Sequence, residues 1–234
     1  MKRLLLCLLC AAGLALTVSH ASATTPMIDW DPALYFEPGA TPLNSNPGAE
    51  LRIVGTVSSF GPPLDFLNAN MPAREYTLYA HSLISQGTTP LGPPATTFYT
   101  TFYVGGAIEI YEDVTPDASF DPNPPNAGVP ADFTDGTLIL SGVFMSFYTE
   151  TNNFTMFQIG HSEGNILWTG GTLLPLMRPE GSDEPCPGLY TGALTWRSSI
   201  VEPGYLFRHD GKIDFNCPVS SRPTTWGAVK ALYR

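Results

Sequence analysis

Glycine and proline constrain this chain most strongly, contributing 22 and 23 of its 234 residues. Proline removes a backbone donor and clashes with the preceding turn of a helix, and glycine is unfavourable in a helix interior. A long helix does not fit between such frequent breaks. The segments between them are rich in Tyr, Phe, Thr, Val and Ile, the residue types that favour strands. The sequence therefore predicts an all-β fold.

The expected architecture is a single antiparallel β-sandwich or β-barrel of about nine strands with a short C-terminal helix. We expect turns at Asp210-Gly211 and Gly105-Gly106, because these dipeptides tolerate the positive φ of two-residue hairpin loops. Asn152-Asn153 is a third turn candidate. The predicted strands cover residues 51–60, 75–85, 96–104, 107–112, 137–149, 154–160, 165–177, 189–199 and 205–215.

The first 23 residues have the three parts of a bacterial-type secretory signal peptide. Lys2 and Arg3 precede an apolar run over residues 4–18, and Ala21-Ser22-Ala23 supplies the small residues that signal peptidase needs. The apolar run is shorter than the roughly 20 residues of a membrane-spanning helix. We expect cleavage after Ala23 and a secreted, periplasmic or cell-surface protein without membrane insertion.

The remaining residues divide into three parts by composition. Residues 24–50 are predicted to be an irregular N-terminal segment, because Pro, Asn and Gly are frequent there. Residues 51–223 form the predicted β domain. Residues 224–234 form the predicted helix, in which Trp226, Val229, Leu232 and Tyr233 share one face.

The charge of the exported chain excludes one class of partner. Removal of Lys2 and Arg3 leaves nine basic residues against 21 acidic ones, and no Lys or Arg occurs between Arg74 and Arg178. Nucleic-acid affinity depends on neutralising phosphates with Lys and Arg, so nucleic acid is not an expected partner. An anionic membrane surface is excluded for the same reason.

Two features suggest cross-links or ligands. Cys186 and Cys217 are the only cysteines after the signal peptide, and an oxidising compartment favours one disulfide between them. The acidic connection over residues 113–135 could supply oxygen ligands to calcium, or it could simply be solvated. Its candidate ligands are Asp113, Asp117, Asp121, Asp132 and Asp135. No other cofactor is expected.

Residues 105–113, with the sequence GGAIEIYED, and residues 133–142, with the sequence FTDGTLILSG, resemble passages in uncharacterised exported bacterial β-rich proteins. The resemblance covers about forty residues. It implies export and a β-rich fold, and it transfers no site residue.

The chain lacks the nucleophile elbow, the zinc-protease motif and the nucleotide-binding loops that would indicate an enzyme. The leading hypothesis is therefore a secreted non-enzymatic module, structural or ligand-binding. The alternative is a secreted carboxylate-dependent hydrolase such as a glycosidase, with acids drawn from Glu109, Glu112, Asp113 or Glu163. An outer-membrane barrel is disfavoured by the 23 prolines and the expected disulfide. The tryptophans could fill a core or form a stacking platform for sugars.

Overall fold

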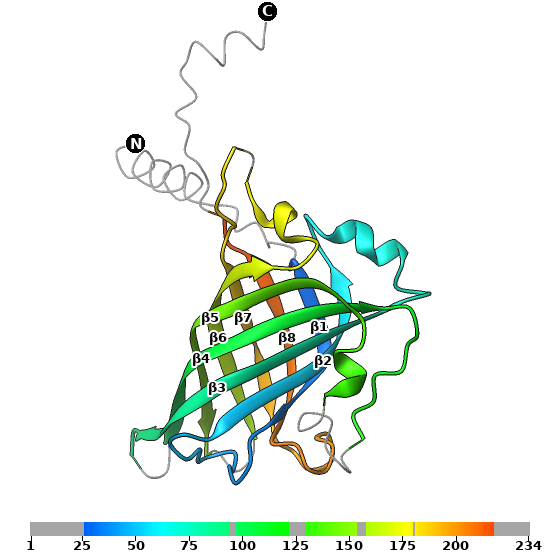
Figure 1. The fold of residues 1–234 in the computed structure, drawn as a ribbon. Helices are drawn as coiled ribbons and strands as arrows, with labels where there is room; N and C mark the ends of the chain where they lie inside the picture. The colour runs from blue at the N-terminus through cyan, green and yellow to red at the C-terminus, as the bar shows by residue number, and fades with distance from the viewer. Residues whose placement is uncertain (1–25, 94–96, 122–129, 154–157, 180, 218–234) are drawn as a thin grey trace, which may run out of the picture.

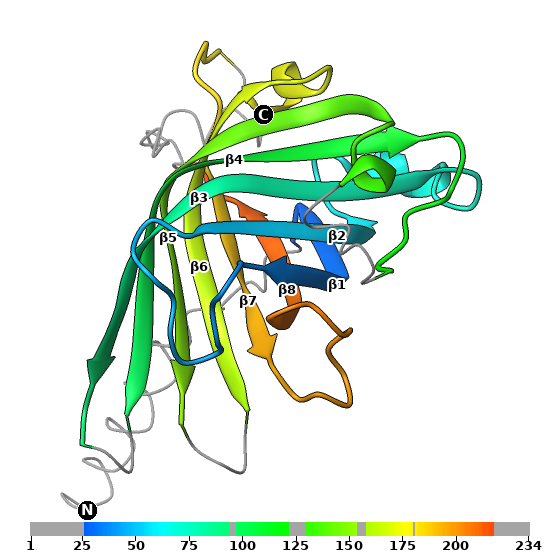
Figure 2. The same ribbon diagram turned by 60° about the horizontal axis from the view of Figure 1, so that its bottom comes forward.

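The computed structural model describes residues 26–93, 97–121, 130–153, 158–179 and 181–217. Their strands form one closed barrel in which each strand pairs antiparallel with the next, and β1 pairs with β8 (Figures 1 and 2). The all-β antiparallel prediction is confirmed, and the architecture is a barrel. The strands are β1 (Ile28–Phe36), β2 (Glu50–Phe60), β3 (Glu75–Leu91), β4 (Phe98–Asp113), β5 (Thr137–Asn152), β6 (Ile159–Gly170), β7 (Gly188–Thr195) and β8 (Phe207–Phe215). Short 3-10 helices η1 (Asp65–Ala69), η3 (Ala131–Phe133) and η4 (Leu174–Met177) lie in the connections.

The N-terminal boundary of the β domain was predicted wrongly. Residues 24–50 were expected to be irregular, yet β1 lies within them and closes the barrel against β8. The inward side chains of β1 include Trp30 and Ala33, which are three residues apart because the register shifts between them. The proline in that bulge and the broken alternation removed the two-residue period that identifies a strand.

The number of strands was also predicted wrongly, since the described residues form eight. Gly105 and Gly106 have the positive φ values of +69° and +97° that a turn would require, but they lie inside β4, where the backbone is locally irregular. The predicted segments 96–104 and 107–112 therefore belong to one strand. A Cβ at Gly106 would lie 2.5 Å from Leu83 Cδ2, so this position needs glycine for packing as well. The predicted segments 154–160 and 165–177 likewise both contribute to β6, through residues 159–160 and 165–170, and residues 174–177 form η4. Residues 154–157 of the first segment lie outside the described residues.

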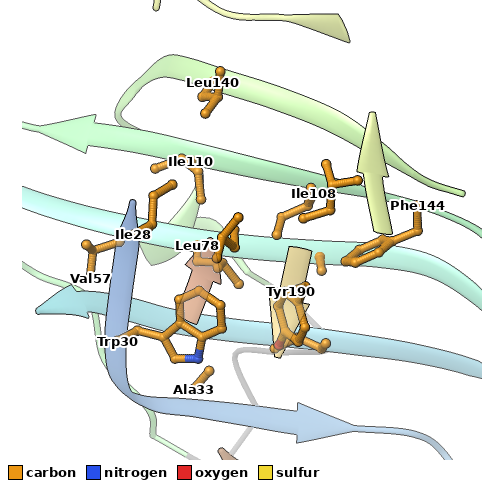
Figure 3. Close-up of a cluster of buried hydrophobic side chains, with 14 of the residues drawn as sticks. Ile28, Trp30, Ala33, Val57, Leu78, Ile108, Ile110, Leu140, Phe144 and Tyr190 are labelled. Carbon is orange, nitrogen blue, oxygen red and sulfur yellow. The ribbon is translucent and has the colours of Figure 1, made fainter. Parts of the chain in front are cut away.

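The hydrophobic core fills the interior of the barrel. Side chains from opposite walls meet there, as Figure 3 shows for Trp30, Leu78, Ile108, Phe144 and Tyr190. Phe144 and Tyr190 pack edge to face with their ring centroids 5.8 Å apart. Aromatic side chains each bury large areas, so a few of them fill the space that an eight-stranded barrel encloses.

One polar cluster is buried within this core, around His209. The indole Nε1 of Trp30 donates to His209 Nδ1 at 3.0 Å, so the proton of the neutral imidazole lies on Nε2, which faces Ser162 Oγ at 3.0 Å. From Ser162 the hydroxyls of Tyr35 and Tyr190 continue the chain at 3.0 and 2.9 Å, and Tyr190 returns to His209 Nδ1 at 3.3 Å. Burial lowers the pKa of His209 to about 3. The imidazole is therefore neutral at physiological pH and satisfied by this cluster.

Space for the imidazole comes from two glycines. Asp210-Gly211 was predicted to be a hairpin turn, but both residues lie within β8, opposite Ala193 and Gly192 of β7. A Cβ at Gly211 or Gly192 would collide with the ring of His209. Glycine is needed at position 211 because a side chain there would collide with His209. The prediction of a turn was wrong because an Asp-Gly dipeptide occurs both in hairpin turns and in strands where a neighbouring group approaches the backbone closely.

The two ends of the barrel differ. One end, called the base below, carries the η1 and η4 connections and Cys186 and Cys217, whose Cα atoms lie 4.8 Å apart at disulfide distance. The other end, called the mouth, carries the β1–β2, β3–β4, β5–β6 and β7–β8 connections. Among the described residues, no helix is both long enough and apolar enough to cross a membrane. The predicted signal peptide and the predicted C-terminal helix at 224–234 lie outside the described residues.

Candidate functional site

The β1–β2 connection, residues 37–49, crosses the mouth from one wall to another. Thr151 Oγ1 of β5 donates to the carbonyl of Pro42 at 2.8 Å. On β3, Thr88 Oγ1 accepts a bond from the amide of Ser45 at 2.7 Å. These contacts join residues far apart in sequence, so they hold the connection over the end of the barrel.

A buried carboxylate lies beneath this connection. Glu37 is 5 % exposed, and it accepts hydrogen bonds from Tyr103 Oη at 2.9 Å and from Ser45 Oγ. Burial raises the pKa of Glu37, and the bonds from Ser45 and Tyr103 offset part of that rise. The carboxylate fixes the connection to β4 from the inside. Residues 24–50 were expected to be irregular, so sequence reasoning did not identify Glu37.

A hollow of about 450 Å³ opens beside the same connection. We call it the mouth hollow. One wall comes from the β1–β2 connection and the other from the β7–β8 connection. Its volume lies within the range of small-molecule sites. The lining residues are Ala40, Thr41, Pro42, Trp196, Ser198, Val201, Glu202, Pro203, Gly204, Tyr205 and Leu206.

The described part of the lining is mainly aromatic and apolar and includes one carboxylic acid. Trp196 is half-buried and packs edge-on to Phe207 with ring centroids 6.0 Å apart, so its position is fixed by the barrel. Tyr205 is buried, and the carboxylate of Glu202 is exposed at the rim. Among the described residues, no Lys or Arg lines the hollow. Such a lining can stack against an apolar or cationic surface and repels an anion.

The tryptophans divide between the two roles considered for them. Trp30 and Trp168 are buried in the core. Trp196 lines the mouth hollow, and Trp226 lies outside the described residues. Sequence reasoning could not separate Trp196 from the others, because the burial of a tryptophan depends on tertiary contacts that no local pattern gives.

The acidic connection brings together part of the predicted calcium set. Asp113, Asp117 and Asp135 place carboxylate oxygens within 4.8 Å of one another, whereas Asp121 and Asp132 are not in this group. Burial, and then the charges of Asp113 and Asp117, raise the pKa of Asp135.

Calcium binding stays a prediction. If the three carboxylates bind it, millimolar calcium raises the melting temperature, and Asp117→Asn abolishes the rise while Asp121→Asn keeps it. An unchanged wild-type melting curve would show that the carboxylates are only solvated.

Three of the carboxylates proposed for a hydrolase each contact a different tyrosine. Glu109 accepts a bond from Tyr111 at 2.8 Å on the outer face of β4. Glu112 accepts a bond from Tyr76 at 2.7 Å, and Glu163 of β6 accepts a bond from the hydroxyl of Tyr148 of β5 at 3.4 Å. None of these acids lines the mouth hollow.

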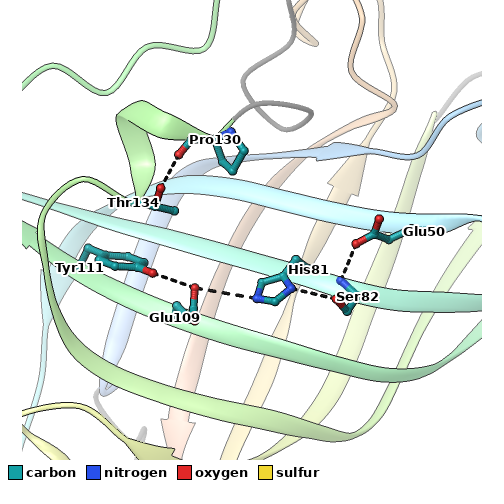
Figure 4. Close-up of polar contacts among 7 residues, drawn as sticks. All are labelled: Glu50, His81, Ser82, Glu109, Tyr111, Pro130 and Thr134. Carbon is teal, nitrogen blue, oxygen red and sulfur yellow. Dashed lines mark hydrogen bonds and ion pairs between the residues drawn. The ribbon is translucent and has the colours of Figure 1, made fainter.

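A serine, a histidine and a glutamate form a chain of side-chain contacts on the outer face of β3 and β4 (Figure 4). Ser82 Oγ lies 2.9 Å from His81 Nδ1, and His81 Nε2 lies 3.9 Å from Glu109. Ser82 has φ of +58°, a strained conformation for a residue other than glycine. However, the amide of Ser82 donates to the Glu50 carboxylate at 2.9 Å. Acyl transfer needs free N–H donors near the nucleophile to stabilise an oxyanion, and here a negative carboxylate occupies that position. The arrangement therefore does not support a serine hydrolase.

Comparison with known proteins found no match to a protein-family model, and no match among curated proteins or solved structures. The functional argument therefore rests on the geometry described above.

Proposed function

We propose that this chain is an exported, non-enzymatic binding module, and that the mouth hollow is its ligand site. The observation that carries the proposal is the hollow itself, about 450 Å³ between two connections with an aromatic and apolar lining. The core side chains fill the barrel interior, so the ligand would bind at the end of the barrel. Eight-stranded barrels commonly bind ligands at their mouths.

The ligand is a small organic molecule with an apolar face and a positive or neutral charge. Trp196 offers the largest flat apolar surface of the lining, and Glu202 is the one carboxylic acid among the described lining residues. A cation over an indole gains about 0.5–2 kcal/mol, depending on how far it is desolvated. The excess of acidic residues in the whole chain also favours a positively charged ligand.

The alternative, a carboxylate-dependent hydrolase, has less support. Glycoside hydrolysis uses two carboxylates that flank one bond. The described residues that line the mouth hollow include one carboxylate, Glu202, while Glu37 is covered by the β1–β2 connection and hydrogen-bonded to Ser45 and Tyr103. The proposal of export is tested by N-terminal sequencing of the secreted protein, which should begin at Thr24.

Binding is measured by calorimetry and tryptophan fluorescence with three probes: choline as a cation, methyl glucoside as a neutral sugar and acetate as an anion. We expect choline to bind most tightly and acetate not to bind. Trp196→Ala should weaken choline binding about tenfold, because it removes the stacking surface. Glu202→Gln should weaken it about two- to fivefold, as expected for an exposed carboxylate.

Two matched variants control for general effects. Ile200→Ala changes an exposed residue of the same connection that does not line the hollow, and Glu184→Gln removes an exposed charge at the base. Both should bind choline like the wild type. If all three probes fail to bind, or the controls lose as much affinity as the site variants, the proposal is wrong.

A further inference from the structure

An apolar strip lies exposed on the outside of β4, β5 and β6. It consists of Phe102, Val104, Val143, Met145 and Leu167, and Met145 is 68 % exposed. Val143 pairs with Leu167 across the β5–β6 ladder, so their side chains are neighbours on one face. Figures 1 and 2 show these three strands side by side. Contiguous apolar surface of this kind marks an interaction site more often than scattered apolar residues do.

The strip is bordered by carboxylates. Glu163 pairs with Tyr148, whose ring lies 5.8 Å from that of Phe102 at one end of the strip. Glu150 pairs with His161 beyond it, and Glu109 lies on the outer face of β4 at the other end. Their contacts within the described residues are to hydroxyl groups and imidazoles. The surface therefore suits an occupant that is apolar in its centre and basic at its edges.

Residues 218–234, outside the described residues, have that composition. They contain Arg222, Lys230 and Arg234 and no Asp or Glu, although the chain as a whole is acidic. Trp226, Val229, Leu232 and Tyr233 recur at the spacing that puts apolar residues on one face of a helix. The segment complements the strip in both charge and apolar character.

The segment also starts close enough to reach the strip. The disulfide joins Cys217 to Cys186, just before β7, and the amide of Asn216 donates to the carbonyl of Pro187 at 3.0 Å. From β7 to β4 is three strand spacings, about 15 Å along the barrel surface. Seventeen residues can span up to roughly 55 Å when extended, so the length is ample.

We propose that residues 218–234 dock on the apolar strip of their own barrel. Trp226 and its apolar neighbours cover Val143, Met145 and Leu167, and the basic residues approach the bordering carboxylates. This docking involves the outer wall of the barrel and is independent of the mouth hollow.

The lysine positions allow a sharp test. After the signal peptide the chain has two lysines, Lys212 within β8 and Lys230 within the proposed docked segment. A lysine-specific protease applied to the folded full chain therefore reports on Lys230 through a single small cleavage product. Val143→Ser and Met145→Ser, combined, reduce the apolar surface without adding charge. We expect this variant to be cleaved at Lys230 about tenfold faster than the wild type, which corresponds to a docking free energy of about 1.4 kcal/mol.

The control is Leu91→Ser, because Leu91 is 67 % exposed, like Met145, but lies at the mouth end of β3. It should leave both cleavage at Lys230 and the melting temperature unchanged, whereas the loss of about 1.4 kcal/mol of docking should lower the melting temperature of the strip variant by only about 3–5 °C. Equal cleavage of the wild type and the strip variant would overturn the proposal. Protection that grows with protein concentration would also overturn it, because the strip would then bind a second copy.

Discussion

Acidification from pH 6.5 towards pH 3 is expected to reduce the free energy of unfolding through His209, by an amount on the order of 4 kcal/mol from this residue alone. Burial lowers the pKa of His209 to about 3 in the folded protein, whereas an unfolded histidine has a value of 6.5. Below pH 6.5 the unfolded chain therefore binds a proton that the folded chain does not. The stability contribution is complete above pH 6.5 and is lost as the pH falls towards 3.

Other groups oppose this trend and must be separated from it. Burial raises the pKa values of Glu37 and Asp210, so these carboxyls favour the folded state as the pH falls. The hydrogen bond from Arg52 lowers the pKa of Glu50, which adds to the loss in acid. The net curve of the wild type combines these contributions, and a histidine variant isolates one of them.

The measurement is the free energy of unfolding by urea at several values between pH 7.5 and 4, for the wild type and His209→Gln. Glutamine offers an acceptor to Trp30 and a donor to Ser162 but does not titrate. The difference between the two curves should change by about 1.4 kcal/mol per pH unit below pH 6. Nuclear magnetic resonance of the wild-type His209 imidazole, which should show no titration down to pH 4, tests the same point if the variant fails to fold. Parallel stability curves, or an imidazole that titrates near pH 6.5, would refute this account.

Removal of the disulfide is expected to lower the free energy of unfolding by about 3–4 kcal/mol. The two cysteines are 31 positions apart, and closing a loop of that length restricts the unfolded chain by roughly this amount in the chain-entropy treatment. The loop includes β7 and the whole of β8, the strand that closes the barrel against β1. Loss of the cross-link therefore affects the last step of barrel closure.

The experiment compares urea unfolding of the wild type with that of the double variant Cys186→Ser and Cys217→Ser. Reduction of the wild type gives a second measurement without any substitution at Cys186, which is 2 % exposed. Both should shift the midpoint in the same direction. A loss below about 1 kcal/mol in both would mean that the cross-link restricts the unfolded chain little. Thiols that can be alkylated in the unreduced protein would show that the bond does not form.

The sequence alone determined the properties that depend on neighbouring residues or on counting. The all-β class follows from Pro and Gly breaks between β-favouring segments, because strand propensity and helix breaking act over a few residues. The pairing of Cys186 with Cys217 followed because the sequence after residue 10 contains no other cysteine. The acidic connection was identified as a charge cluster, and Asp113, Asp117 and Asp135 do come together.

Only the tertiary structure decided the features that depend on distant contacts. Gly211 has the sequence context of a hairpin turn, yet its function is to make room for His209 between β7 and β8. β1 was missed because a bulge breaks its period, and pairing with both β2 and β8 makes it a strand. The mouth hollow joins Pro42 to Trp196, more than 150 positions apart in the chain. No local pattern encodes such a meeting, because closing the barrel brings these connections together.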